Sequence, residues 1–201
     1  MPRVLVLTGL PGSGKSEAAE IAKLLDIPVF SMGDVIRTET TNRGLESNSQ
    51  NIGMVAMNLR EEFGDDIVLQ RLWPIVRDAL IINNLVLIDG MRSIAEKNAL
   101  IQLMGFEPEI LAILASEDIR NSRLVGRKRS DDVKIDKDGK GIDLTDETEK
   151  NHAISERDKR EKGWGVEELL EQANYKIDNE DSMDSFRTDV KALLEGLNTP
   201  D

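Results

Sequence analysis

The stretch TGLPGSGKSEAAEIA, residues 8–22, decides the fold because it contains the full G-x-x-x-x-G-K-[ST] pattern of a phosphate-binding loop. The apolar run RVLVLT, residues 3–8, leads into it, and a segment with helical spacing follows it. A strand, a glycine loop and a helix in this order surround a phosphate with backbone N–H groups and the positive end of a helix. We therefore expect a bound nucleoside triphosphate. The loop alone leaves open transfer to a small molecule, transfer to water, and use as a switch.

The residues of the loop have separate expected roles. Lys15 has the reach to contact the β- and γ-phosphates, and the Ser16 hydroxyl is suited to bind Mg²⁺. A glycine-rich turn that only joins a strand to a helix is the alternative, but a chance match in a chain of this length has a probability on the order of 1%. The backbone positions expected to hold ATP are Gly9, Leu10, Pro11, Gly12, Ser13 and Gly14.

Composition narrows the class of protein further. The 201 residues are 39% hydrophobic and 32% charged, which is typical of a folded globular protein. The formal net charge of −12 disfavours broad binding to nucleic acids or anionic membranes. The chain has no cysteine, so disulfides and thiolate metal sites are excluded. No apolar run approaches the roughly 20 residues that span a bilayer. We expect a cytoplasmic protein.

Short apolar runs alternate with longer helical patterns along the chain, which predicts an α/β fold. We expect a three-layer P-loop NTPase fold, with a five-stranded parallel sheet and helices on both faces. The expected strands cover residues 3–8, 27–30, 85–88, 109–115 and 175–177. The expected helices cover residues 17–25, 34–41, 50–63, 66–82 and 93–103, with a last helix that Ser182 caps and that runs to about Leu194.

The whole chain, residues 1–201, is expected to form one domain that carries two excursions. Residues 31–65 form a polar excursion between the second and third strands. A lid region at about 120–160 contains a charged hairpin at 130–148, where Asp138-Gly139 is a turn signal between VKI and IDL.

Two later segments place polar side chains after strands, where ligands bind in open α/β sheets. In LVLIDGMRS, residues 85–93, Asp89 is suited to hold Mg²⁺ and Arg92 to contact a phosphate. The alternative makes Asp89 a helix cap and Arg92 a solvated charge, and the position at the strand end favours the metal role. In FSMGDVIRTE, residues 30–39, Asp34 and Arg37 are equally compatible with a ligand and with a cap and a surface ion pair.

Arginines gather on either side of the charged hairpin. Arg120, Arg123 and Arg127 have the spacing of one helix face, with Arg129 close by, and Arg157 and Arg160 follow the hairpin. A solvated basic face is one interpretation. The other is a flap that brings cations over a triphosphate and excludes water.

These motifs resemble the nucleoside monophosphate kinase superfamily over nearly the whole chain. FSMGDVIR is similar to the S-T-G-D-x-x-R segment of adenylate kinases, which implies that Gly33, Asp34 and Arg37 line an acceptor-nucleotide pocket. IDGMRS is similar to their D-G-F-P-R segment, which implies a Mg²⁺-linked role for Asp89 and an acceptor-phosphate role for Arg92. The proline of that segment is absent here.

The arginines near the hairpin also resemble adenylate kinase positions. Arg123-Leu-Val-Gly-Arg127 is similar to the start of the adenylate kinase lid, which implies that Arg123 lies near the donor base and Arg127 near phosphates. Arg157 resembles the arginine that returns after the lid.

A group of archaeal adenylate-kinase-related proteins, sometimes labelled dephospho-CoA-kinase-like, shows the greatest similarity. The shared segments are GLPGSGKSE, GDVIR, LREEFGDD, DGMRS, KGWGVEE and ANYKIDNED. This similarity implies an acceptor-side role for Arg60 and places Asn179 near the donor adenine.

The resemblance implies an ATP- and Mg²⁺-dependent kinase that acts on a nucleotide or nucleotide-like phosphorylated acceptor. From the net charge we expect no nucleic-acid or membrane partner. The residues it implies in catalysis are Lys15, Asp34, Asp89, Arg92, Arg123, Arg127 and Arg157. A dephospho-CoA kinase-like activity and an acceptor-independent ATPase or nucleotide switch are the alternatives. In the last of these, Asp34, Arg37 and Arg92 would lack a purpose.

Overall fold

The computed structural model describes residues 2–125, 134–135, 141–142, 155, 158–159 and 161–199. In this part of the chain, five parallel strands form one sheet in the order β2-β3-β1-β4-β7. They are β1 (Arg3–Thr8), β2 (Val29–Ser31), β3 (Leu85–Asp89), β4 (Glu109–Leu114) and β7 (Tyr175–Asp178). The prediction of an α/β fold with a five-stranded parallel sheet is confirmed.

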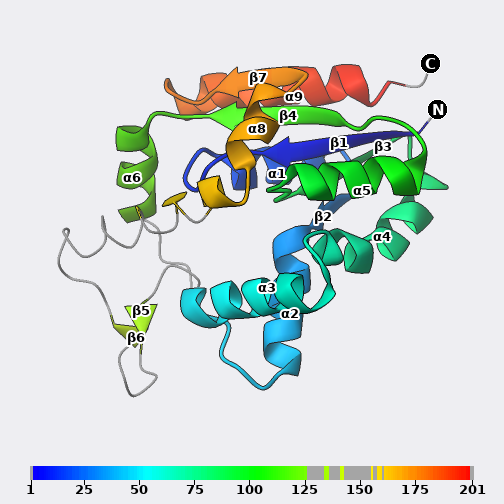
Figure 1. Ribbon diagram of the computed structural model, residues 1–201. Helices are drawn as coiled ribbons and strands as arrows, with labels where there is room; N and C mark the ends of the chain where they lie inside the picture. The colour runs from blue at the N-terminus through cyan, green and yellow to red at the C-terminus, as the bar shows by residue number, and fades with distance from the viewer. Residues whose placement is uncertain are drawn as a thin grey trace.

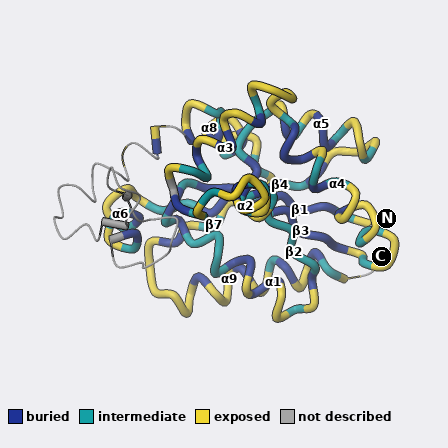
Figure 2. The backbone as a smooth tube through the Cα atoms, turned by 90° about the horizontal axis from the view of Figure 1, so that it is seen from below, coloured by how far each residue is buried: buried dark blue, intermediate teal, exposed yellow. Residues whose placement is uncertain are grey.

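Helices cover both faces of the sheet. They are α1 (Lys15–Leu24), α2 (Met32–Asn42), α3 (Ser49–Phe63), α4 (Ile67–Leu80), α5 (Ile94–Met104), α6 (Glu117–Val125), α8 (Val166–Glu171) and α9 (Met183–Leu197). Figure 2 shows α1 and α9 on one side of the strands and α3, α4, α5 and α8 on the other. The order of the layers is helix, sheet, helix.

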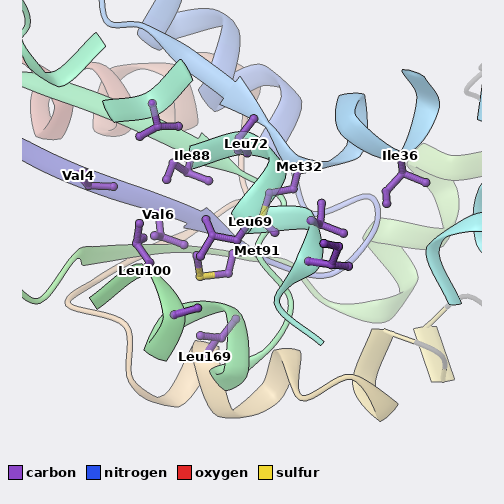
Figure 3. Close-up of a cluster of buried hydrophobic side chains, with 14 of the residues drawn as sticks. Val4, Val6, Met32, Ile36, Leu69, Leu72, Ile88, Met91, Leu100 and Leu169 are labelled. Carbon is purple, nitrogen blue, oxygen red and sulfur yellow. The ribbon is translucent and has the colours of Figure 1, made fainter. Parts of the chain in front are cut away.

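Alternation along the strands produces this layering, because successive side chains of a strand point to opposite faces. Val4 and Val6 of β1 join a buried cluster with α2, α3, α4, α5 and α8, and Figure 3 shows them there beside Leu69, Ile88 and Leu100. Leu5 and Leu7 pack instead against α1 and α9. Strands covered on both faces need apolar residues at every position, which explains the continuous runs in the sequence.

Polar side chains define where several helices begin. Ser93 accepts a hydrogen bond from the Glu96 N–H at the start of α5, and Ser182 accepts one from the Ser185 N–H at the start of α9. The cap predicted at Ser182 is confirmed. A cap of this kind stabilises a helix by roughly 1 kcal/mol.

The charged segment contains a short antiparallel pair, β5 (Lys134–Ile135) and β6 (Gly141–Ile142), in which Lys134 pairs with Ile142. This pairing agrees with the predicted hairpin, and its turn at 138–139 lies outside the described residues. Figure 1 shows the pair at the same end of the molecule as α6. Among the helices that the structure describes, none has the length and apolar character to cross a membrane.

Candidate active site

The phosphate-binding loop joins β1 to α1 in a backbone conformation that requires glycine. Gly12 and Gly14 have φ angles of 80° and 116°. A Cβ atom at Gly12 would also lie 2.7 Å from the carbonyl oxygen of Arg120. No described side chain caps α1, so the first N–H groups of this helix are available to an anion in the loop.

Side chains from two distant elements hold the loop from outside. Arg120 of α6 donates a hydrogen bond to the Pro11 carbonyl at 3.1 Å. Asn179, directly after β7, donates from Nδ2 to the Ser13 carbonyl at 2.8 Å. Arg123 in turn donates to the main-chain oxygen and to Oδ1 of Asn179, at 2.9 and 3.0 Å. The loop is therefore fixed by contacts that its own sequence does not reveal.

These contacts correct the interpretation of the arginines of α6 as a solvated basic face. Arg120 is buried and forms an ion pair with Asp158 at 2.7 Å. Asn179 is also buried, under the loop, and is not among the residues that line the cleft described next. Arg127, Arg129, Arg157 and Arg160 lie outside the described residues.

A cleft of about 290 Å³ opens over the loop. It brings together residues from β1–α1, α2, the end of β3, α6 and the segment before α8. Its lining residues are Pro11, Gly12, Gly14, Lys15, Ser16, Glu17, Ser31, Gly33, Arg37, Asp89, Gly90, Arg92, Arg123, Leu124 and Glu161. Lys15 donates from Nζ to the carbonyls of Gly9 and Leu10, which hold the ammonium close to the loop.

Asp89 ends β3 beside the loop, in register with Leu7 of β1 and Ser31 of β2. The Oδ1 atom is buried and accepts no hydrogen bond from the described residues. Burial raises the pKa of Asp89, and the charges of Lys15 and Arg92 partly oppose this rise. A buried carboxylate oxygen with spare acceptor capacity, in one cleft with the Ser16 hydroxyl, fits Mg²⁺, which favours few protein oxygens plus water and phosphate. The described residues contain no group of three or more acidic or histidine side chains that would form a full metal cage.

The structure excludes the capping roles considered for Asp89 and Asp34. Ser93 caps α5, and Ser31 occupies the N-cap position of α2. Asp34 lies in the first turn of α2, is 68% exposed at its side chain, and is not among the residues that line the cleft. Its Oδ1 accepts hydrogen bonds from the Arg37 guanidinium, at 3.0 Å from Nε. Arg37 therefore pairs with a helix neighbour and also lines the cleft.

Arg92 follows β3 and lines the cleft. Its guanidinium lies 3.5 Å from Glu161 Oε1 and 5.4 Å from the ring centroid of Trp164. Arg92 retains 30% side-chain exposure, so it is held in place and still accessible to a ligand. The alternative of a freely solvated charge does not fit these contacts.

The structure places Arg60 outside the cleft lining. It donates to Glu96 Oε1 at 2.8 Å, where Glu96 is fully buried, and its guanidinium lies 5.0 Å from the Trp164 centroid. The buried carboxylate draws this arginine inward. Sequence reasoning missed Glu161, which is buried and lines the cleft. The signal that points to it is the three-residue spacing of Asp158, Glu161 and Trp164.

The fold and the glycine loop define a P-loop NTPase-like protein, a class for which nucleotide binding, typically with Mg²⁺, is expected. A family model described as an AAA domain matches residues 8–137.

Relatives give the particular family. The chain is 40% identical over 194 residues to a UPF0200 protein of Methanosarcina acetivorans, covering 96% of this chain and 95% of the relative. It is 36% identical over 192 residues to a UPF0200/UPF0201 protein of Archaeoglobus fulgidus, and this match covers 96% of this chain and only 55% of the relative. The chain belongs to the UPF0200 family.

A solved structure supports the fold alone. The crystal structure of TT1252 from Thermus thermophilus has a TM-score of 0.54 and 19% identity, with 98% of this chain and 99% of that chain covered.

Proposed function

We propose that this protein is an ATP- and Mg²⁺-dependent kinase that acts on a nucleotide or nucleotide-like small molecule, in the manner of nucleoside monophosphate kinases. The main support is the composition of one cleft. Lys15 and Ser16 line it on the loop side, and Arg37 and Arg92 line it from segments that follow two other strands. The first pair serves ATP binding in kinases and hydrolases alike, and the second pair supplies cations from two further segments for the phosphate of a second ligand.

The donor side binds the triphosphate through the loop N–H groups and Lys15. A phosphate has to compete with the Gly9 and Leu10 carbonyls for the Lys15 ammonium. Ser16 and Asp89 would hold Mg²⁺, which supplies charge neutralisation at the β- and γ-phosphate oxygens when bound. Arg123 lines the cleft and contacts Asn179, which supports a donor-side role for it.

The acceptor side binds an anion between Arg37 and Arg92 and points it at the γ-phosphorus. A phosphate oxygen of the acceptor forms the new bond, and the bond from the γ-phosphorus to the bridging oxygen breaks, which leaves ADP. An anionic phosphate oxygen needs no general base, so catalysis consists of positioning and charge stabilisation. In this mechanism, the only role of Asp34 is to orient the Arg37 side chain.

The test is a panel of acceptors. ADP or GDP formation is measured from ATP and from GTP, with and without each nucleoside monophosphate and dephospho-CoA. We expect stimulation by one acceptor. Lys15→Ala should lower this rate by about 100-fold or more while circular dichroism shows an intact fold. Turnover that is equal with and without every acceptor would identify an ATPase instead, and full transfer by Lys15→Ala would refute the role of the loop.

A further inference from the structure

The segment that follows the charged hairpin presents three side chains at regular spacing. Asp158, Glu161 and Trp164 are three residues apart, and residues 158–159 and 161–163 are helical. Helical residues three apart are neighbours on the helix surface, and Trp164 lies in the turn that follows. Each of the three contacts an arginine that another part of the fold contributes.

Asp158 connects this segment to the phosphate-binding loop. Its Oδ2 lies 2.7 Å from the Arg120 guanidinium, and both side chains are buried. Arg120 also donates to the Pro11 carbonyl of the loop. The Asp158 carboxylate therefore holds the Arg120 side chain, and Arg120 in turn holds the loop on the donor side of the cleft.

Glu161 and Trp164 connect the same segment to the acceptor side. The Arg92 guanidinium contacts the Glu161 carboxylate and lies over the Trp164 ring. Arg60 contacts the same ring and pairs with Glu96, whose other oxygen accepts the Arg92 backbone N–H at 2.8 Å. Both the backbone and the guanidinium of Arg92 are therefore held.

We propose that Asp158, Glu161 and Trp164 are positioning residues, which set Arg120 on the donor side and Arg92 on the acceptor side of one cleft. The proposal rests on the kinase function proposed above. An arginine has many rotamers, and their loss on binding weakens affinity. Holding the Arg92 guanidinium beforehand removes part of that loss, so the segment determines how tightly the acceptor binds.

The first test measures KM for the acceptor, kcat, and the Kd for ATP. Trp164→Leu removes the aromatic face and should raise acceptor KM about tenfold, with ATP affinity within about twofold. Trp164→Phe keeps a ring face and should restore most of the acceptor affinity. Lys162→Gln is the matched control, because Lys162 lies in the same segment and pairs only with Glu167 on the surface among its described contacts. An unchanged KM in Trp164→Leu, or an equal loss of ATP affinity, overturns the proposal and leaves the kinase function standing.

The second test does not depend on turnover. The chain has two tryptophans, so Trp73→Phe leaves Trp164 as the sole tryptophan emitter. With the loop filled by ADP and Mg²⁺, inorganic phosphate should change the Trp164 emission saturably, and Arg92→Ala should abolish this response. If the response appears and no acceptor supports transfer, the positioning role stands and the kinase function fails. If the Trp73→Phe protein shows no response, the proposal is overturned.

Discussion

Asp89 has a buried carboxylate oxygen at the edge of the cleft. This Oδ1 atom accepts no hydrogen bond from the described residues, and the residue lines a cleft that also contains Lys15 and Arg92. Burial raises the pKa of Asp89, which means that the folded protein disfavours the ionised form. The protonated form of Asp89 therefore stabilises the folded state relative to the ionised form. This stabilisation is fully present below the ordinary pKa of an aspartate, and it is lost as the pH rises through the raised pKa of Asp89.

Asp89→Asn should therefore be more stable than the wild type at neutral pH without Mg²⁺. The difference in free energy of unfolding should grow as the pH rises through the window between the ordinary and the raised pKa. Urea unfolding at a series of pH values measures it.

The added stability from Mg²⁺ with ADP should be smaller in Asp89→Asn than in the wild type, because the proposed metal-binding role of Asp89 requires the ionised carboxylate. Asp78→Asn, an exposed site paired with Arg77, serves as the control. A loss of stability in Asp89→Asn at every pH would contradict this account of the carboxylate.

Single residues were predictable where a motif or a strand end determines them. Lys15, Asp89 and Arg92 all line the cleft as expected. Arg60 does not, since its position depends on Glu96 of another helix, and a sequence shows no such partnership. Glu161 was missed because its spacing from Asp158 and Trp164 gains meaning only from its tertiary neighbour Arg92.

At the scale of elements, the conformation of the phosphate-binding loop between β1 and α1 depends on contacts from other parts of the fold. Gly12 shows this most clearly, since a side chain there would meet the backbone of Arg120 in α6. Gly105 has the same φ of 80° after α5, and a Cβ atom there would meet nothing within 4 Å. Alanine substitutions at Gly12 and Gly105 therefore distinguish the free-energy cost of backbone strain from the cost of a steric collision with α6.

Gly105→Ala should lower the free energy of unfolding by about 1 kcal/mol, the usual cost of a left-handed alanine. Gly12→Ala should lower it further and should also weaken ATP binding at least tenfold, because relief of the collision moves the loop. Chemical unfolding and calorimetric titration with ATP measure the two effects. Equal effects of both substitutions on ATP binding would show that α6 does not constrain the loop.

The strands were predicted to within about two residues because buried parallel strands are continuous apolar runs. The start of α1 was placed at Glu17, and the helix begins at Lys15, because the last loop residues already have helical geometry. The six-residue helix α8 was not predicted. It is too short for a periodic pattern, and burial of Val166 and Leu169 against the rest of the fold defines it.

At the scale of the whole molecule, several cationic side chains of this acidic chain lie at one place. The net charge is −12, yet Lys15, Arg37, Arg92 and Arg123 all line one cleft. The parallel sheet causes this, because β1 and β3 end at the same edge and β2 lies beside β3. Such a cleft favours anionic ligands. The parallel sheet could be expected from the loop and the alternating apolar runs, whereas the identity of the second ligand depends on cleft details that no motif specifies.

The most direct measurement follows the γ-phosphate itself. ATP labelled at that phosphate is incubated with the protein and each acceptor of the panel, and the label is separated into inorganic phosphate and phosphorylated acceptor. A kinase should place the label on one acceptor, and Arg37→Ala should reduce that product without increasing labelled inorganic phosphate. Label that appears only in inorganic phosphate, at a rate no acceptor changes, would contradict the proposal.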